Sequence, residues 1–258
     1  MATWNDFFSN NPTCAIFDGV TWSASAPIEP SVAQNNIFSS YNSLLNRTVA
    51  TWTDNVTGDP VYSVYNGSSW TSSAPIIATQ QAISESVFTA FVLDKTYAIW
   101  LDSFDIPYLS SYEGGSWSAP MEVSTGDYSG IILNSYDSIR MHTISTWNDL
   151  ATSTPFFSIF DGMNWSDPAM IQNTPVLSRN VFSVFDSTSG QTFVIWLNPL
   201  FMLNYSIYDG MAWGPVLNVG AAAFGLGNVF LTFDFVRNQI LATWIDPLSR
   251  PVYAIYTP

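Results

Sequence analysis

The sequence predicts an all-β fold built from one antiparallel unit that repeats along the chain. Three observations predict it: one tryptophan phrase recurs at nearly constant spacing, a second recurs between its copies, and the intervening segments are rich in β-branched and aromatic residues. No segment shows a competing helical period. Of the 258 residues, 47% are hydrophobic and 16% aromatic, so the chain can bury a full-sized core and is not disordered.

The first recurring phrase is Ala-Thr-Trp-x-Asp or a close variant. Its tryptophans are separated by 48, 48, 47, 49 and 48 residues, and they are Trp4, Trp52, Trp100, Trp147, Trp196 and Trp244. The second phrase, Asp, Asn or Glu followed by Gly-x-x-Trp, contains the other five of the 11 tryptophans. Random placement does not produce this pattern, so a structural repeat of about 48 residues is predicted.

Each repeat reads as four short strands. In one copy the first strand is 180–185 and ends in a turn at 186–190, and the second, 193–196, carries the first tryptophan. A loop that usually contains proline leads to the third strand, 204–208. The Asp-Gly or Asn-Gly pair then makes a tight hairpin, and the second tryptophan opens the fourth strand.

Four-stranded antiparallel units at this period are typical of a β-propeller, whose large aromatic residues fill the wedges between blades. The chain shows six second and third strands but five first and fourth strands. We therefore predict six blades with incomplete terminal blades, and five blades as the alternative. The missing strands would indicate a truncated chain or reading frame, or a homo-oligomer that completes the ring. A single domain, 1–258, is expected, with repeats at approximately 2–34, 35–82, 83–128, 129–176, 177–224 and 225–258.

The hairpin phrases carry a family resemblance. Ile16-Phe-Asp-Gly-Val-Thr-Trp22 and its copies at 159–165 and 207–213 resemble degenerate Asp-box (BNR) repeats. These occur in sialidases, in related bacterial repeat proteins and, in looser form, in fungal fucose-binding lectins. The resemblance implies a propeller whose hairpins lie opposite the face that such proteins use for catalysis. By the same analogy we expect a secreted or cell-surface protein, with no signal peptide visible in the sequence.

Composition excludes several classes of function. Six Lys and Arg against 20 Asp and Glu give a formal net charge of −14, which repels nucleic acid. Cys14 is the one cysteine and His142 the one histidine, so neither an intrachain disulfide nor a His/Cys zinc cluster is expected. No segment approaches the roughly 20 apolar residues of a membrane-spanning helix. Cys14 and His142 are interpreted as strand residues that pack.

A carboxylate or amide lies two residues after each tryptophan of the first phrase. These residues are Asp6, Asp54, Asp102, Asp149, Asn198 and Asp246. At the ends of second strands they would recur around the entrance face, where a ring of oxygen atoms can bind sugar hydroxyls, a hard cation such as Ca²⁺, or a basic partner. The alternative is that each one caps its own loop. No cofactor and no metal are predicted.

The residues of the hairpin phrase are interpreted as structural. The acidic or amide residue is expected to hold the turn through its own backbone, and the tryptophan to pack between blades or, where exposed, to stack on a sugar. They are Asp18, Asn66, Glu113, Asp161 and Asp209, with Trp22, Trp70, Trp117, Trp165 and Trp213. Asn66 and Glu113 depart from the aspartate of the Asp-box pattern.

The loops after the ring differ between repeats, so recognition is expected there. The loop after Asn198 is conspicuously apolar, with Leu200, Phe201 and Met202. These side chains are expected either to contact a ligand or another protein, or to cover the mouth of the channel.

Catalysis is not predicted. The sialidase resemblance implies a cluster of arginines at the entrance, but Arg47, Lys95, Arg140 and Arg237 fall in turns on the hairpin side, leaving Arg179 and Arg250. A glycosidase with two carboxylates, such as Asp59 and Asp105, is the enzymatic alternative. Fucose lectins use an arginine and a glutamate in each site, for which basic residues are too few.

The function predicted from the sequence is therefore binding without catalysis. The first hypothesis is lectin-like carbohydrate recognition through entrance-face or interblade pockets. The second is a propeller that docks another protein or serves as a scaffold. The expected partner is a glycan or a protein ligand, with no nucleic acid and no membrane span.

Overall fold

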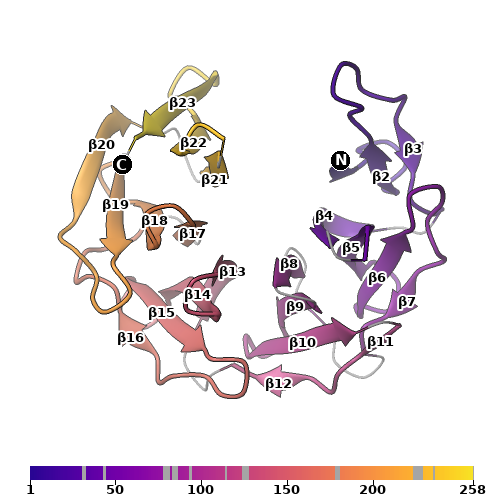
Figure 1. The fold of residues 1–258 in the computed structure, drawn as a ribbon, viewed down its shortest axis with the longest axis horizontal. Helices are drawn as coiled ribbons and strands as arrows, with labels where there is room; N and C mark the ends of the chain where they lie inside the picture. The colour runs from indigo at the N-terminus through magenta and orange to yellow at the C-terminus, as the bar shows by residue number, and fades with distance from the viewer. Residues whose placement is uncertain are drawn as a thin grey trace. The chain divides into compact units, whose positions relative to one another are not determined.

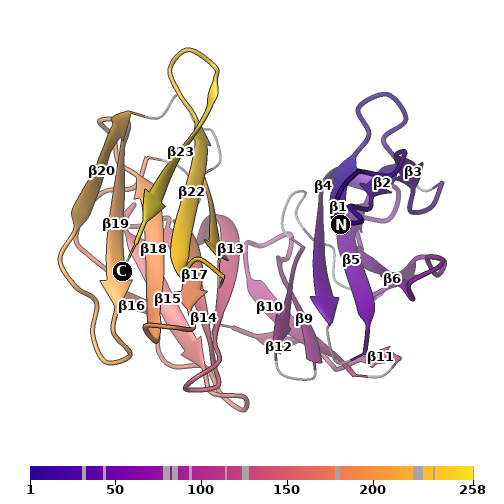
Figure 2. The same ribbon diagram turned by 45° about the horizontal axis from the view of Figure 1, so that its top comes forward.

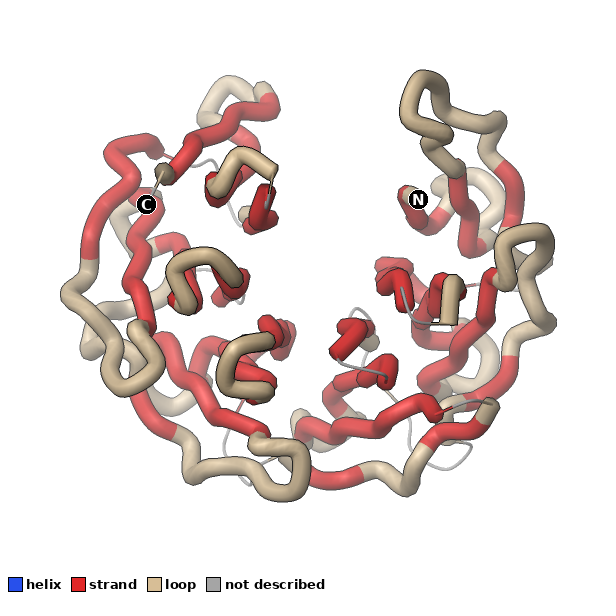
Figure 3. The backbone as a smooth tube through the Cα atoms, in the orientation of Figure 1, coloured by secondary structure: helices blue, strands red, loops and turns tan. Residues whose placement is uncertain are grey.

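The computed structural model describes residues 1–258 except 31–32, 43–44, 78–81, 83–86, 93–94, 114, 124–127, 178–180, 223–228, 235 and 258. The described residues form strands, turns and loops without a helix (Figure 3), and accordingly none of them forms a helix that could cross a membrane. Arg179 lies outside the described residues. The chain divides into two compact units, Met1–Val123 and Ser124–Pro258, which are described separately.

The first unit contains three antiparallel sheets, numbered here in chain order (Figure 1). Sheet 1 consists of β1 (Ala2–Asn5), β2 (Pro12–Ala15) and β3 (Ala26–Pro27). Sheet 2 consists of β4 (Ala33–Asn42), β5 (Arg47–Asp54), β6 (Pro60–Tyr65) and β7 (Ala74–Pro75). Sheet 3 consists of β8 (Phe88–Val92), β9 (Lys95–Leu101), β10 (Pro107–Glu113), β11 (Ser116–Trp117) and β12 (Met121–Glu122). Both β11 and β12 pair with β10, so together they form an interrupted outer strand.

The second unit also contains three antiparallel sheets, whose strands lie side by side in Figure 2. Sheet 4 consists of β13 (Tyr128–Asp137), β14 (His142–Asp149), β15 (Pro155–Phe160) and β16 (Ala169–Met170). Sheet 5 consists of β17 (Val181–Asp186), β18 (Gln191–Leu197), β19 (Met202–Tyr208) and β20 (Leu217–Ala222). Sheet 6 consists of β21 (Phe230–Asp234), β22 (Gln239–Ile245) and β23 (Pro251–Tyr256).

Strands pair in chain order within each sheet, as expected for hairpin-connected units. Among the described residues, sheet 1 lacks the first strand of the repeat and sheet 6 lacks the fourth. The prediction of six antiparallel units with incomplete first and last units is therefore confirmed, and the alternative of five is wrong. Cys14 lies buried in β2 and His142 begins β14, so both occupy strand positions.

In sheet 3 the tryptophan of the second phrase opens the outer strand as predicted, since β11 contains Trp117, but in the other sheets with an outer strand that strand begins later than the sequence predicts. Trp70 forms only an isolated bridge with Tyr65, and β7 starts at Ala74. Sheets 4 and 5 behave alike, with bridges from Phe160 to Trp165 and from Tyr208 to Trp213. A proline lies at or near the restart of each outer strand, and proline fits an edge strand because no partner there requires its missing N–H.

The core of each unit lies between neighbouring sheets. Five of the six tryptophans of the first phrase are buried there, whereas Trp4 is partly exposed. The buried ones are Trp52, Trp100, Trp147, Trp196 and Trp244. Trp52 packs among Cys14 and Ile28 of the sheet 1 repeat and Ile37 and Ala50 of sheet 2. Removing a buried indole typically costs about 3–5 kcal/mol, so these residues dominate the stability of the junctions.

Candidate functional site

Each residue of the predicted ring lies at the end of a second strand, and its side chain binds its own loop. The Asp6 Oδ1 atom accepts hydrogen bonds from the backbone N–H groups of Phe8, at 3.2 Å, and Ser9, at 2.9 Å. The Asp102 Oδ1 atom accepts them from Phe104, at 2.8 Å, and Ile106, at 2.9 Å. These contacts are those of loop caps, which is one of the two interpretations of the sequence.

The other four ring residues bind in the same manner. Asp54, Asn198 and Asp246 each accept two backbone N–H groups of their loops, and Asp149 accepts the N–H and the hydroxyl of Thr152. The N–H of Ser9 lowers the pKa of Asp6 below its usual value, and the side chain of Arg250 does so for the pKa of Asp246. Across the described residues, no three or more His, Cys, Asp or Glu side chains gather closely enough to hold a metal ion.

The capped loops present apolar side chains to solvent. The residue two positions after the cap is Phe8 (93% exposed), Val56, Phe104 (81%), Leu200 (79%) or Leu248 in five of the six loops. In all five, its backbone N–H donates to the cap, so the exposed side chain projects from an anchored backbone. Sequence reasoning singled out only the loop after Asn198. The recurring apolar residue two positions after the cap was the signal for the others.

Each of these loops also contains a residue in the left-handed region of backbone conformation. They are Asn10, Gly58, Asp105, Ser153, Phe201 and Ser249, with φ between 53° and 74°. Such a conformation reverses the chain within a few residues and is unfavourable for most side chains. The six loops thus have two related geometries: the left-handed residue lies four positions after the cap in the loops of Asp6, Asp54 and Asp149, and three positions after it in the other three loops.

The hairpin residues hold turns at the opposite end of the sheets. The Oδ1 atoms of Asp18, Asn66, Asp161 and Asp209 each accept the N–H groups two and three residues ahead, at 2.8–3.0 Å. The following glycine has a φ of 98° to 104° in each, which explains why glycine is needed there. The N–H of Thr21 lowers the pKa of Asp18, that of Asn164 the pKa of Asp161, and that of Ala212 the pKa of Asp209. Glu113 differs, because its carboxylate pairs with Lys95.

When the preceding sheet belongs to the same unit, the tryptophan of the second phrase packs on the third strand of that sheet. Trp117 lies against Tyr62 with ring centroids 5.3 Å apart, and Trp213 against Phe157 at 5.4 Å. Trp70 donates its indole N–H to the Cys14 Sγ atom at 3.3 Å. Trp22 belongs to sheet 1, the first sheet of its unit, and is 56% exposed.

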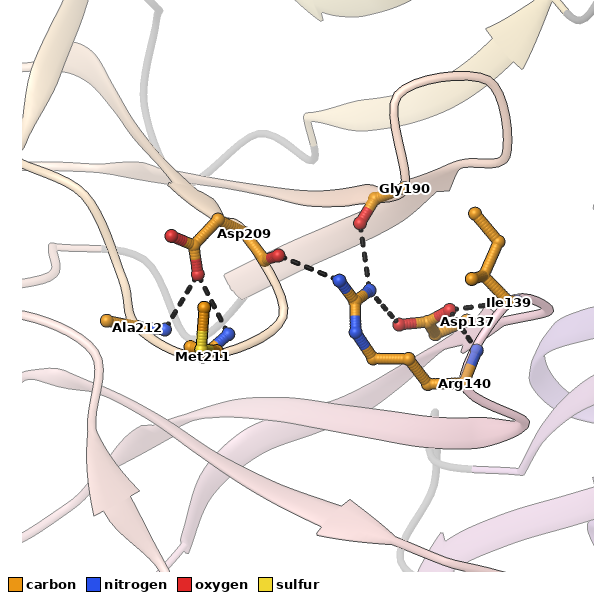
Figure 4. Close-up of polar contacts among 7 residues, drawn as sticks. All are labelled: Asp137, Ile139, Arg140, Gly190, Asp209, Met211 and Ala212. Carbon is orange, nitrogen blue, oxygen red and sulfur yellow. Dashed lines mark hydrogen bonds and ion pairs between the residues drawn. The ribbon is translucent and has the colours of Figure 1, made fainter.

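Most of the described basic side chains are held by carboxylates of the protein. Lys95 pairs with Glu113, Arg140 with Asp137, Arg237 with Asp234, and Arg250 with Asp246. Arg250, expected at the entrance, therefore lies in the last loop with its guanidinium bound to the loop cap at 2.6 Å. Arg140 also bonds to the carbonyl groups of Gly190 and Asp209, on the turn side of the sheets (Figure 4).

A pocket of about 250 Å³ lies between sheets 5 and 6 of the second unit. Phe193, Tyr205 and Asn218 line it from sheet 5, and Ala242, Ala254 and Tyr256 from sheet 6. Asn218 donates a hydrogen bond to the Asn204 Oδ1 atom at 3.2 Å. With Asn218 and two tyrosine hydroxyls as its polar side-chain groups, the described lining suits an apolar or aromatic ligand group.

No protein-family model matches the sequence, and no curated protein matches it. Solved structures do. The SapL1 lectin in complex with alpha-methyl fucoside is 11% identical, with a TM-score of 0.66 over 96% of this chain and 86% of that one. A lectin of Aleuria aurantia, described as a six-bladed β-propeller with a novel fucose recognition mode, is 11% identical, with a TM-score of 0.57 over 85% and 74%. The Hadza microbial sialidase Hz136 is 10% identical, with a TM-score of 0.60 over 96% and 59%.

These similarities define the class of fold. At 10–12% identity they show architecture alone. Together with the six antiparallel sheets, they identify the chain as a six-bladed β-propeller. Neighbours of this architecture include fucose-binding lectins and a sialidase, so the fold by itself does not select between binding and catalysis.

Proposed function

We propose that the chain is a non-catalytic, lectin-like propeller that binds carbohydrate through the loops following its second strands. The observation that carries this proposal is the pair of phenylalanines in the first unit, Phe8 and Phe104, which are 93% and 81% exposed. Their backbone N–H groups are fixed by Asp6 and Asp102. An anchored aromatic ring can stack on the apolar face of a sugar with little loss of conformational entropy.

Polar groups adjoin both rings and can bond sugar hydroxyls. Ser9 and Asn10 follow Phe8, and Asp105 follows Phe104, all of them exposed. The Phe7 ring meets Phe8 edge to face with centroids 5.6 Å apart, which widens the apolar platform of the first loop. The combination of an aromatic face with nearby amide and carboxylate groups suits a ligand with one apolar face and several hydroxyls.

The basic residues support binding without sialidase-type catalysis. Lys95, Arg140, Arg237 and Arg250 are paired with protein carboxylates, so four of the five described cations are engaged. A substrate carboxylate that binds any of these four side chains would have to displace its protein partner. Likeness to fucose lectins supports carbohydrate binding at the level of the fold.

A glycan array probed with and without Ca²⁺ tests this function, followed by titration of the best glycan. Phe8→Ala and Phe104→Ala are expected to weaken binding by about 10-fold or more, as loss of an aromatic anchor does. Met211→Ala is the matched control, because Met211 is equally exposed but lies in a hairpin at the other end of its sheet. An array without signal, or phenylalanine variants that bind like the control, would contradict the proposal.

A second candidate function is docking of another protein, which the loops of the second unit favour. Leu200 and Leu248 project from capped loops, and Phe201 holds a left-handed conformation with a φ of 59°. Leu200 and Leu248, the most exposed apolar side chains of these two loops, are aliphatic, and the Phe201 ring beside Leu200 is 45% exposed. Leu200→Asp combined with Leu248→Asp should abolish binding of a protein partner and leave glycan binding by the first unit unchanged.

A further inference from the structure

Asn66 is the only asparagine of the chain that is followed by glycine. The pair forms part of the tight hairpin of sheet 2, and residues 66–69 are all exposed. Asparagine is chemically labile because its side-chain carboxamide can react with the backbone nitrogen of the next residue to form a cyclic imide. Glycine in that next position has no Cβ atom to obstruct the approach. Sequence and exposure together single out Asn66 as a reactive position.

The surroundings of Gly67 leave room for this reaction. Gly67 has a φ of 98°, and a Cβ atom at this position would meet open space. The hairpin is also weakly held, because Trp70 forms only an isolated bridge with Tyr65 and the outer strand restarts at Ala74. Such a segment opens locally at little cost in free energy, which lets the carboxamide of Asn66 and the nitrogen of Gly67 approach each other.

Hydrogen-bond donors converge on the side-chain oxygen of Asn66. The Oδ1 atom accepts the backbone N–H and the hydroxyl of Ser68, both at 2.9 Å, and the backbone N–H of Ser69, at 3.0 Å. When a nitrogen adds to the carboxamide carbon, negative charge develops on this oxygen. Donors that already point at such an oxygen stabilise the charge, as those of an oxyanion hole do. The turn that orients the side chain therefore also favours its conversion.

A carboxylate at position 66 fits the same turn. Asp18, Asp161 and Asp209 occupy the equivalent position in three other hairpins, and each accepts the N–H groups two and three residues ahead, at 2.8 Å. These N–H groups lower the pKa of all three carboxyl groups, so the turn favours the ionised form. An ionised carboxylate is a poor electrophile, so the reaction does not run back through the imide.

We propose that Asn66 is a self-modifying site, at which the hairpin of sheet 2 converts the carboxamide to a carboxylate. The nitrogen of Gly67 attacks the Asn66 Cγ atom and gives up its proton, while the Cγ–Nδ2 bond breaks and that nitrogen leaves as ammonia. Water then opens the imide at either carbonyl carbon, which leaves aspartate or isoaspartate at position 66. The reaction consumes water and releases ammonia, and no group is oxidised or reduced. The site shares no residue with the loops proposed to bind carbohydrate, so the two proposals stand independently.

Mass spectrometry of the folded 258-residue chain tests this reaction. The protein is incubated at neutral pH in water enriched in the heavy isotope of oxygen, and its proteolytic peptides are mapped at intervals. Heavy oxygen should enter at residue 66, because the new carboxylate takes an oxygen atom from water. Asn55 and Asn164 are the internal controls, since both are exposed but are followed by valine and tryptophan, and they should keep their carboxamides.

Variants of the exposed turn separate the role of the donors from that of the Asn-Gly pair. Ser68→Ala removes one donor and should slow the conversion by about 2- to 10-fold, the usual effect of one hydrogen bond, whereas Ser68→Thr keeps the hydroxyl and should react like the parent. Asp161→Asn creates a matched Asn-Gly hairpin in sheet 4, where the described contacts to the side chain are two N–H groups without a hydroxyl. This new asparagine should react more slowly than Asn66.

The proposal fails on any of three results. If Asn66 keeps its carboxamide while a synthetic peptide of residues 61–72 loses it, then the folded hairpin protects the side chain. If another asparagine reacts first, then the Asn-Gly pair does not select the site. If Ser68→Ala reacts as fast as the parent or faster, then the donors hold the unreacted amide rather than the oxyanion. Heavy oxygen at position 66 that enters more slowly in Ser68→Ala, and at the parent rate in Ser68→Thr, supports the proposal.

Discussion

The guanidinium group of Arg140 donates a hydrogen bond of 2.8 Å to the backbone carbonyl of Asp209, which joins the turn of sheet 4 to the hairpin of sheet 5 (Figure 4). It also donates to the carbonyl of Gly190 at 2.9 Å and pairs with Asp137 at 2.7 Å. The Asp137 side chain is only 1% exposed, and it accepts hydrogen bonds from the backbone N–H groups of Ile139 and Arg140 besides its ion pair with the guanidinium group. One cation therefore fixes three turns from two neighbouring sheets.

Arg140→Ala is expected to lower the free energy of unfolding by about 2–4 kcal/mol. The substitution removes the ion-pair partner of the buried Asp137 carboxylate and the hydrogen-bond donor of the Gly190 and Asp209 carbonyl groups. Urea unfolding at pH 7 measures this. Arg237→Ala is the control, since its ion pair with Asp234 has the same spacing but is exposed and should contribute less than about 1 kcal/mol. Equal losses for the two variants would show that the bonds to Gly190 and Asp209 stabilise nothing.

Gly210 and Gly162 form a matched pair that tests the contacts of the Arg140 guanidinium group. Both have a φ near 98°, but a Cβ atom at Gly162 would meet open space whereas one at Gly210 would meet the Arg140 guanidinium. Gly162→Ala should cost about 1–2 kcal/mol from backbone strain alone, and Gly210→Ala should cost more. In an Arg140→Ala background the two costs should become equal. If Gly210→Ala still costs more than Gly162→Ala without Arg140, then a contact other than the Arg140 guanidinium group causes the larger cost.

The repeated strands were predictable because each is specified locally. Trp52 and Trp100 mark second strands, and Asp209-Gly210 marks a hairpin, because alternation and turn chemistry involve neighbours in sequence. The loop caps were predictable only as one of two alternatives. The carboxylate of Asp102 can accept bonds from its own loop or from a ligand, and only the backbone path of 103–106 decides between them.

The contacts between sheets were beyond sequence reasoning. Arg140 and Asp209 are 69 residues apart, and nothing in either phrase indicates that they meet. Glu113 was grouped with the hairpin aspartates by its position, but its longer side chain reaches Lys95 instead. The pocket between sheets 5 and 6 brings together Phe193 and Tyr256, which lie on strands far apart in the sequence, so its position could not be predicted either.

Acid stability should depend on the hairpin aspartates. Asp18, Asp161 and Asp209 have pKa values lowered by backbone N–H groups, so their ionised forms favour the folded state. Their contribution is complete above the unfolded pKa of about 3.9 and is lost as the pH falls through the lower folded pKa. Replacing all three by asparagine, which Asn66 shows to be compatible with the turn, should flatten the loss of stability between about pH 5 and pH 2.

The reverse substitution provides the control for this pH dependence. Asn66→Asp adds a titrating group to the same turn geometry and should steepen the loss of stability in acid. Urea unfolding at several pH values compares the two variants with the parent chain. Curves that run parallel for all three proteins would show that these carboxylates titrate alike in the folded and unfolded states.

The tryptophans of the second phrase that pack between sheets should contribute more to stability than the one that does not. Trp213 packs on Phe157 of the preceding sheet and on Tyr208 of its own, so Trp213→Ala should cost about 2–4 kcal/mol of unfolding free energy. Trp22 stacks on Phe17 of its own sheet and is 56% exposed, so Trp22→Ala should cost about 1 kcal/mol or less. Urea titrations of both variants against the parent measure the difference. If Trp22→Ala costs as much as Trp213→Ala, then the exposed indole is buried in solution by a contact beyond sheet 1.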